Sequence, residues 1–352
     1  MKKFLSALAA LSILTAALTG CGSSASTATT TAATTATTTA ATAATAAATE
    51  AAAQGTGSEY KVAIVQQLDH TSLDEIRLAI EAELDKKAAE KGITITYKEF
   101  NGQNDATVLN QIGAQVVSDQ YDAILPIATL AATTMATATE ENRIPVIYAA
   151  ISDPASSDLT GIPNVTGTSD ALNTQFILDM MLAAQPDIET VGLLYSNSEV
   201  NSVTPIAEAK AYLDSKGIAY LEKTGNSTDE ILTAASAMVG RVQAVFTPTD
   251  NVVMAAASAV AEILTDAGIP HYTGADSFVT AGAFTTCGVN YTELGTYTAD
   301  MAVDILLGGA IPEYHVMDGG IITVNTDTAK ALGIDYSVFS TMAGTVKEVT
   351  TE

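Results

Sequence analysis

The chain has 352 residues, of which 47% are hydrophobic and 16% are charged, so it is long enough to bury a sizeable core. Its 40 acidic side chains outnumber 15 lysines and arginines and give a formal net charge of −25, which makes nucleic acid a poor partner. The same charge is repelled by anionic lipid, so no basic patch is expected to hold the chain on a membrane.

The first twenty residues predict a secretory signal peptide. Two lysines precede an apolar run over 4–18, which is too short to cross a bilayer. The run ends in Leu-Thr-Gly before Cys21, a pattern similar to the lipobox of bacterial lipoproteins. That resemblance implies a lipoprotein with a diacylglycerol on the Cys21 thiol and fatty acyl chains such as palmitate. The lipid would anchor it to the extracytoplasmic face of the cell membrane; the alternative is a chance cysteine after an ordinary signal.

The segment that follows, residues 21–58, predicts a disordered linker behind the lipidated cysteine. It consists almost only of Thr, Ala, Ser and Gly without apolar periodicity, so it cannot bury enough surface to offset the entropy of ordering. Because lipid would occupy Cys21, the one other cysteine, Cys287, has no partner for an intrachain disulfide. We expect Cys287 to be a small buried residue.

From Tyr60 onward, short β-branched runs alternate with amphipathic stretches, which is typical of parallel sheets covered by helices. The first unit predicts strands at 61–65, 93–97, 122–127 and 145–148, with helices at 73–91, 105–118 and 130–140. The same order recurs with strands at 191–195, 218–221, 242–247 and 270–272 and helices between them. The sequence therefore predicts an α/β protein with two doubly wound, Rossmann-like lobes.

The residues at which helices end and strands begin also repeat in the two units. Lys91-Gly92-Ile93 corresponds to Lys216-Gly217-Ile218, where a glycine would end each helix in a left-handed conformation and an isoleucine would open the next strand. A helix over 291–307 and a strand over 321–324 fit neither unit, so we expect the chain to return to the first lobe and cross back over a three-strand hinge. The predicted boundaries are 59–168 with 291–310 for lobe 1, and 169–290 with 311–352 for lobe 2.

Two such lobes predict a ligand cleft, because in open α/β sheets ligands bind outside the carboxyl ends of the strands. The polar side chains expected there are hydroxyls, amides and isolated carboxylates, which suit a small zwitterion. The candidates in lobe 1 are Gln67, Asp69, His70, Thr71, Ala128, Thr129, Ser152 and Asp153. The candidates in lobe 2 are Ser198, Asn201, Ser202, Asp250, Asn251, Asp276 and Ser277.

Three of these candidates have a specific role and an alternative. Thr129 stands where a helix begins, so its hydroxyl and the free N–H groups of the helix could bind a carboxylate, or Thr129 could serve only as an N-cap. A buried ammonium needs a carboxylate partner, and Asp250 and Asp276 are the candidates. Both could instead cap the helices that follow them.

Signals for an enzyme are few. The sequence contains no Gly-x-Ser-x-Gly, no Gly-x-x-x-x-Gly-Lys, no His-Glu-x-x-His and no Cys-x-x-Cys, so we predict no catalytic residues, no cofactor and no metal site. His70 is the only base expected at the cleft. His271 and His315 are expected to be surface or edge residues.

Several short motifs together resemble one family of ABC-transporter substrate-binding proteins that includes tryptophan- and tyrosine-type binders. They run in register between about 60 and 332, and include Asn101-Gly102-Gln103-Asn104-Asp105, Ser152-Asp153-Pro154, Asn164-Val165-Thr166-Gly167, Pro248-Thr249-Asp250-Asn251 and Gly288-Val289-Asn290-Tyr291. The resemblance implies the type I periplasmic-binding-protein fold and a monomeric clamp for a small solute, an aromatic or other apolar amino acid. It also implies delivery to ABC permease subunits with a cytoplasmic ATPase.

Two departures from the familiar pattern leave the identity of the solute open. Thr71-Ser72 stands where relatives tend to carry Pro-Ala after the histidine, and Leu130 stands where proline is frequent. Two other functions also remain open: a lipid-anchored sensor that presents its ligand to a membrane receptor, and a two-lobed α/β enzyme. The sensor would use the same site residues as the transport protein.

Overall fold

The structure is a computed structural model that describes residues 57–343 and 345–351. The predicted signal peptide, Cys21 and nearly all of the Thr/Ala-rich linker lie outside the described residues. None of the helices within the described ranges is long and apolar enough to cross a membrane.

The first sheet has six strands in the order β11-β5-β4-β3-β1-β2, and all of its pairings are parallel. The strands are β1 (Glu59–Gln66), β2 (Thr94–Asn101), β3 (Ala123–Ile127), β4 (Val146–Tyr148), β5 (Val165–Ser169) and β11 (His315–Val316). Four helices cover it: α1 (Thr71–Lys91), α2 (Ala106–Ser118), α3 (Thr129–Ala138) and α10 (Tyr291–Leu306). We call this sheet with its helices lobe 1.

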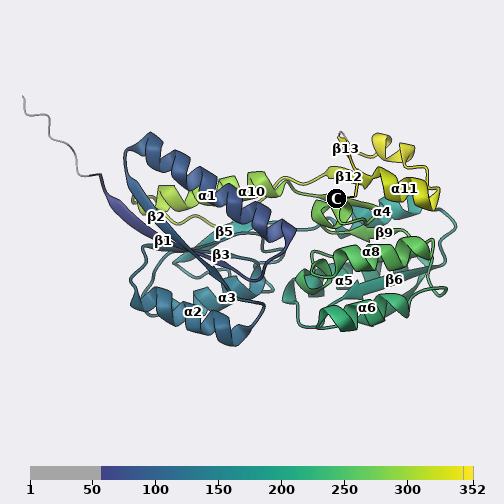
Figure 1. The fold of residues 1–352 in the computed structure, drawn as a ribbon, viewed down its shortest axis with the longest axis horizontal. Coiled ribbons are helices and arrows are strands. Elements are labelled where there is room, and N and C mark those ends of the chain that lie inside the picture. Colours follow the sequence, from purple (N-terminus) through teal and green to yellow (C-terminus); the bar gives the residue numbers. More distant parts are fainter. Residues whose placement is uncertain (1–56, 344, 352) are drawn as a thin grey trace, which may run out of the picture. The chain divides into compact units, whose positions relative to one another are not determined.

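Alternate side chains of β1 explain why helices cover both faces of the first sheet. Val62 and Ile64 are buried with the apolar side of α1, whereas Ala63 and Val65 are buried with α2 and α3. The two faces are visible in Figure 1, where α1 and α10 lie together and α2 and α3 lie across the strands from them. A Cβ on Gly295 of α10 would stand 2.6 Å from the Ile76 carbonyl oxygen, so glycine permits the close approach of α10 to α1.

The second sheet has seven strands in the order β13-β12-β10-β9-β8-β6-β7. Its strands are β6 (Thr190–Tyr195), β7 (Ala219–Thr224), β8 (Ala244–Thr247), β9 (His271–Thr273), β10 (Thr285–Gly288), β12 (Ile321–Asn325) and β13 (Val346–Val349). Only the β10–β12 pairing is antiparallel among the described strands. The antiparallel pair is where the chain re-enters the sheet after its detour through lobe 1.

Helices cover both faces of the second sheet too. They are α4 (Thr174–Ala184), α5 (Val203–Lys216), α6 (Thr228–Ser236), α7 (Asn251–Met254), α8 (Ala257–Asp266), α9 (Asp276–Thr280) and α11 (Thr326–Leu332), with 3-10 turns at η1 (Val200–Ser202) and η2 (Ser337–Thr341). Leu193 and Phe246 are buried with α4 and α5, whereas their neighbours Leu194 and Val245 are buried with α6 and α8. We call this sheet with its helices lobe 2.

The chain crosses between the lobes three times, after β5, after β10 and after β11, which confirms the predicted hinge. The α10 helix packs on α1, as expected of a return to lobe 1. The chain leaves lobe 1 later than the expected boundary at residue 310. The reason is that β11 pairs with β5, so His315 and Val316 belong to the first sheet.

The repeated glycines have the expected conformation. Gly92 and Gly217 follow α1 and α5 with φ of 64° and 69°, the left-handed region that only glycine adopts without strain. Cys287 is buried in β10, and burial raises the pKa of its thiol to about 11. His271 was expected at the surface or an edge, which is wrong: it is buried in β9 and its Nε2 lies 2.8 Å from Thr247 Oγ1.

Candidate functional site

A cavity lies between the lobes where the carboxyl ends of β1, β3 and β4 face those of β6, β8 and β9. Its volume is about 20 Å³, room for about one water, so the lobes are closed over it. Lobe 1 and the first crossing contribute His70, Ser72, Leu73, Ala128, Thr129, Ala150, Ser152, Asp170 and Tyr291. Lobe 2 contributes Asn201, Thr249, Asp250, Asn251, Met254, Ala275 and Phe278.

The cavity is lined by seven of the residues that were predicted from the sequence: His70, Ala128, Thr129, Ser152, Asn201, Asp250 and Asn251. Four others, Gln67, Asp153, Ser202 and Ser277, lie behind them and make hydrogen bonds that hold the two lobes or the lining residues. The remaining four, Asp69, Thr71, Ser198 and Asp276, do not line it.

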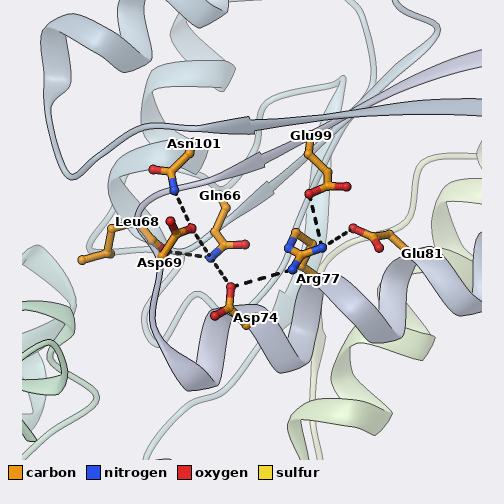
Figure 2. A network of polar contacts seen from close by, with 8 residues as sticks. All are labelled: Gln66, Leu68, Asp69, Asp74, Arg77, Glu81, Glu99 and Asn101. Carbon is orange, nitrogen blue, oxygen red and sulfur yellow. Dashed lines mark hydrogen bonds and ion pairs between the residues drawn. The ribbon is translucent and has the colours of Figure 1, made fainter.

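Asp69 belongs to a different polar network, shown in Figure 2. Its carboxylate accepts a hydrogen bond from Asn101 Nδ2, and Gln66 Nε2 links it to Asp74 on α1 at 2.9 Å. Arg77 is the cation of this network and lies 2.7 Å from Glu81. Asp69 is exposed and is used to tie the end of β1 to β2 and α1, so it does not reach the cavity.

The other three residues that miss the cavity have local roles or point outward. Thr71 is exposed at the start of α1. Ser198 is exposed and hydrogen-bonds to Ser196 Oγ at 2.7 Å. Asp276 begins α9 and pairs with Lys347 at 3.5 Å. Each follows a strand in the sequence, but none of the three lines the cavity.

Direct polar contacts join the two lobes around the cavity. His70 Nε2 lies 3.0 Å from Asn251 Oδ1, and Ser152 Oγ lies 2.9 Å from Thr249 Oγ1. Three more contacts between the lobes are formed. Gln67 Nε2 donates to Glu199 Oε1 at 3.2 Å, Thr204 Oγ1 donates to Asp153 Oδ2 at 2.7 Å, and the Ser72 and Ser277 hydroxyls hydrogen-bond to each other. Burial of Asp153 opposes its ionisation, but hydrogen bonds from Ser156 and Thr204 lower its pKa.

Asp250 is buried and serves as the N-cap of α7, so the capping role that the sequence left open is present. Its Oδ1 accepts from the backbone N–H of Val253 at 3.0 Å. Its Oδ2 accepts from the Ser196 N–H and the Ser202 hydroxyl, both at 2.7 Å. Burial raises the pKa of Asp250 despite these bonds. The carboxylate thus fixes the loop after β6 while one face of it lines the cavity.

Asp170 is a second buried carboxylate in the wall, and the sequence analysis did not find it. Ser152 Oγ donates to its Oδ1 at 2.9 Å, and the Tyr291 hydroxyl donates to its Oδ2 at 3.0 Å. Burial raises the pKa of Asp170, and burial with the adjacent Asp170 raises that of Tyr291. Asp170 follows β5 directly, so the rule applied to other strand ends would have found it had 165–169 been predicted as a strand.

A third carboxylate, Glu199, lies just behind the lining residues. It is buried, it accepts from Asn251 Nδ2 at 2.6 Å, and it contacts Gln67 of lobe 1. Burial and the nearby Asp250 raise the pKa of Glu199 to about 7. No residue among those lining the cavity in the described part of the chain is a lysine or arginine, so these acids have no cation beside them.

Two helices begin at the cavity. Helix α1 starts after His70, and α3 starts after Ala128; neither N-cap side chain accepts a hydrogen bond from its helix. Thr129 is the first residue of α3 and not its N-cap, so the capping alternative for Thr129 is wrong. Gln67 Oε1 accepts from the Leu130 N–H at 2.9 Å and holds the helix start in place. Ala128 has a φ of 74°, an unusual conformation for a residue with a side chain.

The cavity also has an apolar wall that the sequence analysis missed. It consists of Leu73 from α1, Met254 from α7, and Ala275 and Phe278 around α9. In the sequence these residues look like ordinary core positions of helices. Only the spatial arrangement shows that they close one side of a cavity whose other sides are polar.

The family described as ABC transporter substrate binding protein matches residues 61–345. The chain belongs to this family. Members of the ABC transporter substrate-binding family bind solutes and are not enzymes, which agrees with the prediction made from the motifs.

Relatives of this substrate-binding protein include a tyrosine-binding protein of Clostridioides difficile strain R20291, which is 30% identical over 278 residues, 77% of this chain and 80% of that protein. A domain from Streptococcus pneumonia solved in complex with L-Trp is 30% identical with a TM-score of 0.76, covering 82% of this chain and 100% of the solved one. A ligand-free, open substrate-binding protein with adhesive properties from Clostridium difficile is 31% identical with a TM-score of 0.63, covering 83% of this chain and 100% of the solved one.

The two TM-scores differ although the sequence identities are nearly equal. This chain superposes better on the L-Trp complex than on the open structure. The small cavity and the direct contacts between the lobes agree with that difference, because an open clamp would separate His70 from Asn251 and Gln67 from Glu199.

Proposed function

We propose that this chain is the extracytoplasmic capture component of an ABC importer, anchored by lipid at Cys21, that takes up an amino acid with an aromatic or other apolar side chain. It would deliver this amino acid to a permease driven by a cytoplasmic ATPase. The observation that carries the proposal is the cavity between the lobes, in which carboxylates, helix N-termini and an apolar wall converge. These three kinds of surface match the three parts of such a solute.

The ammonium group would bind among the acids. Asp170 and Asp250 are buried in the wall with raised pKa values, and no cationic side chain of the described lining residues neutralises them. A buried anion without a partner is costly, so a ligand that supplies a positive charge stabilises the closed state. Asp170 is the better partner, because both groups bonded to it are side-chain hydroxyls, whereas Asp250 is held by two backbone N–H groups.

The carboxylate group would bind at the starts of α1 and α3. The first N–H groups of a helix have no partner within the helix, and the helix dipole favours an anion there. Thr129 adds a hydroxyl at the same place. Since α1 and α3 both belong to lobe 1, the solute's carboxylate would bind lobe 1 first, and lobe 2 would close over its other groups.

The side chain of the solute would lie against Leu73, Met254 and Phe278. Met is adaptable and an aromatic edge packs well on another ring, so this wall can accept an aromatic group. The relatives whose names state tyrosine and L-Trp support this class of solute. In the present closed form the cavity of about 20 Å³ cannot hold such a side chain, so the lobes must separate for entry.

Transport would follow from a population shift. A solute that touches both lobes binds the closed state better than the open state and biases the equilibrium toward closure. Anchoring by Cys21 rests on the lipobox-like sequence before it, because that residue lies outside the described part of the structure.

The proposal is tested by identifying the solute. Protein purified from its natural membrane is denatured, the released small molecules are identified by mass spectrometry, and calorimetry then compares L-tyrosine, L-tryptophan and L-leucine. We expect an unmodified amino acid with an apolar side chain to be recovered and to bind. Recovery of a sugar, or of a chemically altered product, would contradict the proposal.

A further inference from the structure

One histidine nitrogen in the cavity wall has no hydrogen-bond partner among the described residues. His70 Nε2 bonds to Asn251, but His70 Nδ1 is buried and unpaired. Asn201 Oδ1, from the opposite lobe, is also buried without a partner in the described chain. Both residues line the cavity. Whether these two atoms accept or donate a hydrogen bond decides which solute group they can bind.

The orientation of Asn201 follows from its neighbour. Its Nδ2 donates to the Thr249 carbonyl oxygen at 2.7 Å, and a carbonyl can only accept. The amide oxygen of Asn201 is therefore the unpaired atom, and it can only accept a hydrogen bond.

A chain of hydrogen bonds that begins at Glu199 determines which ring nitrogen of His70 carries the proton. We call this chain of bonds the relay. Ionised Glu199 only accepts, so above its pKa Asn251 must direct its NH₂ group toward Glu199, at 2.6 Å. The Asn251 oxygen then faces His70 Nε2 at 3.0 Å, which requires the proton of the neutral ring to be on Nε2. Nδ1 carries no proton in that tautomer, so it too is an acceptor.

The other side of Glu199 is fixed as well. Gln67 directs its Nε2 toward Glu199 at 3.2 Å and toward Asn104 Oδ1 at 2.8 Å, and its oxygen accepts from the Leu130 N–H. Because a backbone N–H can only donate, Gln67 cannot turn its amide around without losing that bond. Glu199 thus stands between two amides that both donate to it.

We propose that His70 Nδ1 accepts a hydrogen bond from the amine of the solute and that Glu199 is the positioning residue that makes it an acceptor, by fixing the Asn251 amide and hence the histidine tautomer. This inference rests on the proposed function, because it assigns the amine end of an amino acid to the same cavity. Glu199 itself does not line the cavity, and it selects for an amine by way of Asn251 and His70. Asn201 Oδ1 supplies a second acceptor from lobe 2.

Burial of His70 supports a neutral ring in the closed form, since burial lowers its pKa. The bond to Asn251 and the charges of Asp74 and Asp69 oppose this shift, and Asp250 is the charged group facing Glu199. A protonated His70 would present an N–H to an ammonium and repel it. Amine binding should therefore weaken as the pH falls through the range in which His70 gains a proton.

The substitution Glu199→Gln tests the relay, because a glutamine has one acceptor oxygen for two donating amides. Gln67 is held by Leu130, so Asn251 is the amide that turns. Its NH₂ group then faces His70 Nε2, and the ring proton moves to Nδ1, which becomes a donor toward the solute. The double variant Glu199→Gln with Asn251→Asp exchanges acid and amide, so residue 251 again accepts from His70 and the original tautomer returns.

The tautomer is read from ¹⁵N shifts of His70 at a pH above the pKa of Glu199, in the closed complex with the deaminated analogue of L-tryptophan, which retains ring and carboxylate but has no amine. Calorimetry compares the binding of L-tryptophan with that of this analogue. We expect the Nε2–H tautomer in the unmodified protein and in the double variant, and Nδ1–H in Glu199→Gln. That single variant should lose affinity for L-tryptophan by about tenfold or more and for the analogue by less than about threefold. Glu222→Gln is the matched control. Glu222 lies on β7, and its carboxylate pairs with Lys210 and accepts from the Tyr195 hydroxyl, so its replacement should change neither the His70 tautomer nor the two affinities.

An Nδ1–H tautomer in the unmodified protein, or equal losses for both ligands in Glu199→Gln, would overturn the assignment. These results are separate from a failure of the proposed function. If the unmodified protein bound neither ligand, the amino-acid proposal would fail; if it bound both ligands and the His70 tautomer were the same in all three proteins, only the role of Glu199 would fail.

Discussion

Replacing Asp170 by asparagine should weaken solute binding without weakening the fold. The substitution retains the size of the side chain, and both partners of Asp170 are hydroxyls, Ser152 and Tyr291, which can rotate to accept from an amide. What disappears is the negative charge facing the ammonium. Loss of one partner of a buried charge pair typically costs about 2–5 kcal/mol, which corresponds to a rise in Kd of about 30-fold to several thousandfold.

The stability of the solute-free protein should change in the opposite direction. Burial raises the pKa of Asp170 in the folded state, so its ionised form is unfavourable there and stability is lost as the pH rises from the ordinary value through the raised one. Asparagine removes that penalty at neutral pH. The melting temperature of Asp170→Asn should therefore equal or exceed that of the unmodified protein at pH 7, and the difference should vanish at a pH where Asp170 is protonated in both states.

The assay pairs calorimetry of L-tryptophan binding with thermal unfolding at several pH values. Asp179→Asn is the matched control, because Asp179 also accepts a tyrosine hydroxyl, that of Tyr212, but does not line the cavity. An affinity for Asp170→Asn within about threefold of the unmodified protein would refute the reasoning, since a buried ammonium partner cannot be lost so cheaply. A large fall in melting temperature at pH 7 would show that Asp170 is mainly structural.

Three further substitutions test other parts of the site and the anchor. Asp250→Ala should lower the free energy of unfolding by about 1–3 kcal/mol, measured by urea titration, because it removes the α7 cap and leaves the Ser196 N–H unpaired. Unchanged stability would contradict the capping role. Thr129→Val retains the shape of the side chain and should weaken binding by about 1–3 kcal/mol in calorimetry with little change in melting temperature; equal affinity would exclude its hydroxyl. Cys21→Ala should free the protein from membranes in a fractionation experiment, and incorporation of labelled fatty acid by this variant would disprove the anchor.

Much of the fold could be predicted because the apolar residues follow clear helix and strand periodicities and because the glycines that end helices recur in both units. The strands β1 to β4 and β6 to β9 follow directly from runs such as 61–65 and 191–195. The strand β5 was harder, because Val-Thr-Gly-Thr-Ser is short, contains a glycine and is buried by its neighbours and not by an obvious apolar pattern. Missing β5 meant missing Asp170 at its end.

The site could be predicted only in part, because sequence position says which residues follow a strand but not where the turn directs them. Asp69 and His70 are adjacent, yet Asp69 bonds outward to Asn101 while His70 faces the cavity. Phe278 and Met254 carried no signal, since an apolar residue that lines a ligand cavity and one that fills a core look alike in a sequence. Glu199 stands in a polar segment after a predicted strand, but the sequence could not give its role, because that role depends on amides from both lobes.

The chemical character of the contacts between the lobes determines how the clamp responds to its surroundings. The five contacts described above involve hydroxyls, amides, an imidazole and two carboxylates, and no ion pair among the described residues joins one lobe to the other. Salt screens exposed charges but has little effect on neutral hydrogen bonds. Because no ion pair of the described chain joins the lobes and only two of these contacts end on a carboxylate, salt should change the balance between open and closed forms only weakly, so that an exported protein would capture its solute to a similar extent over a range of salt concentrations.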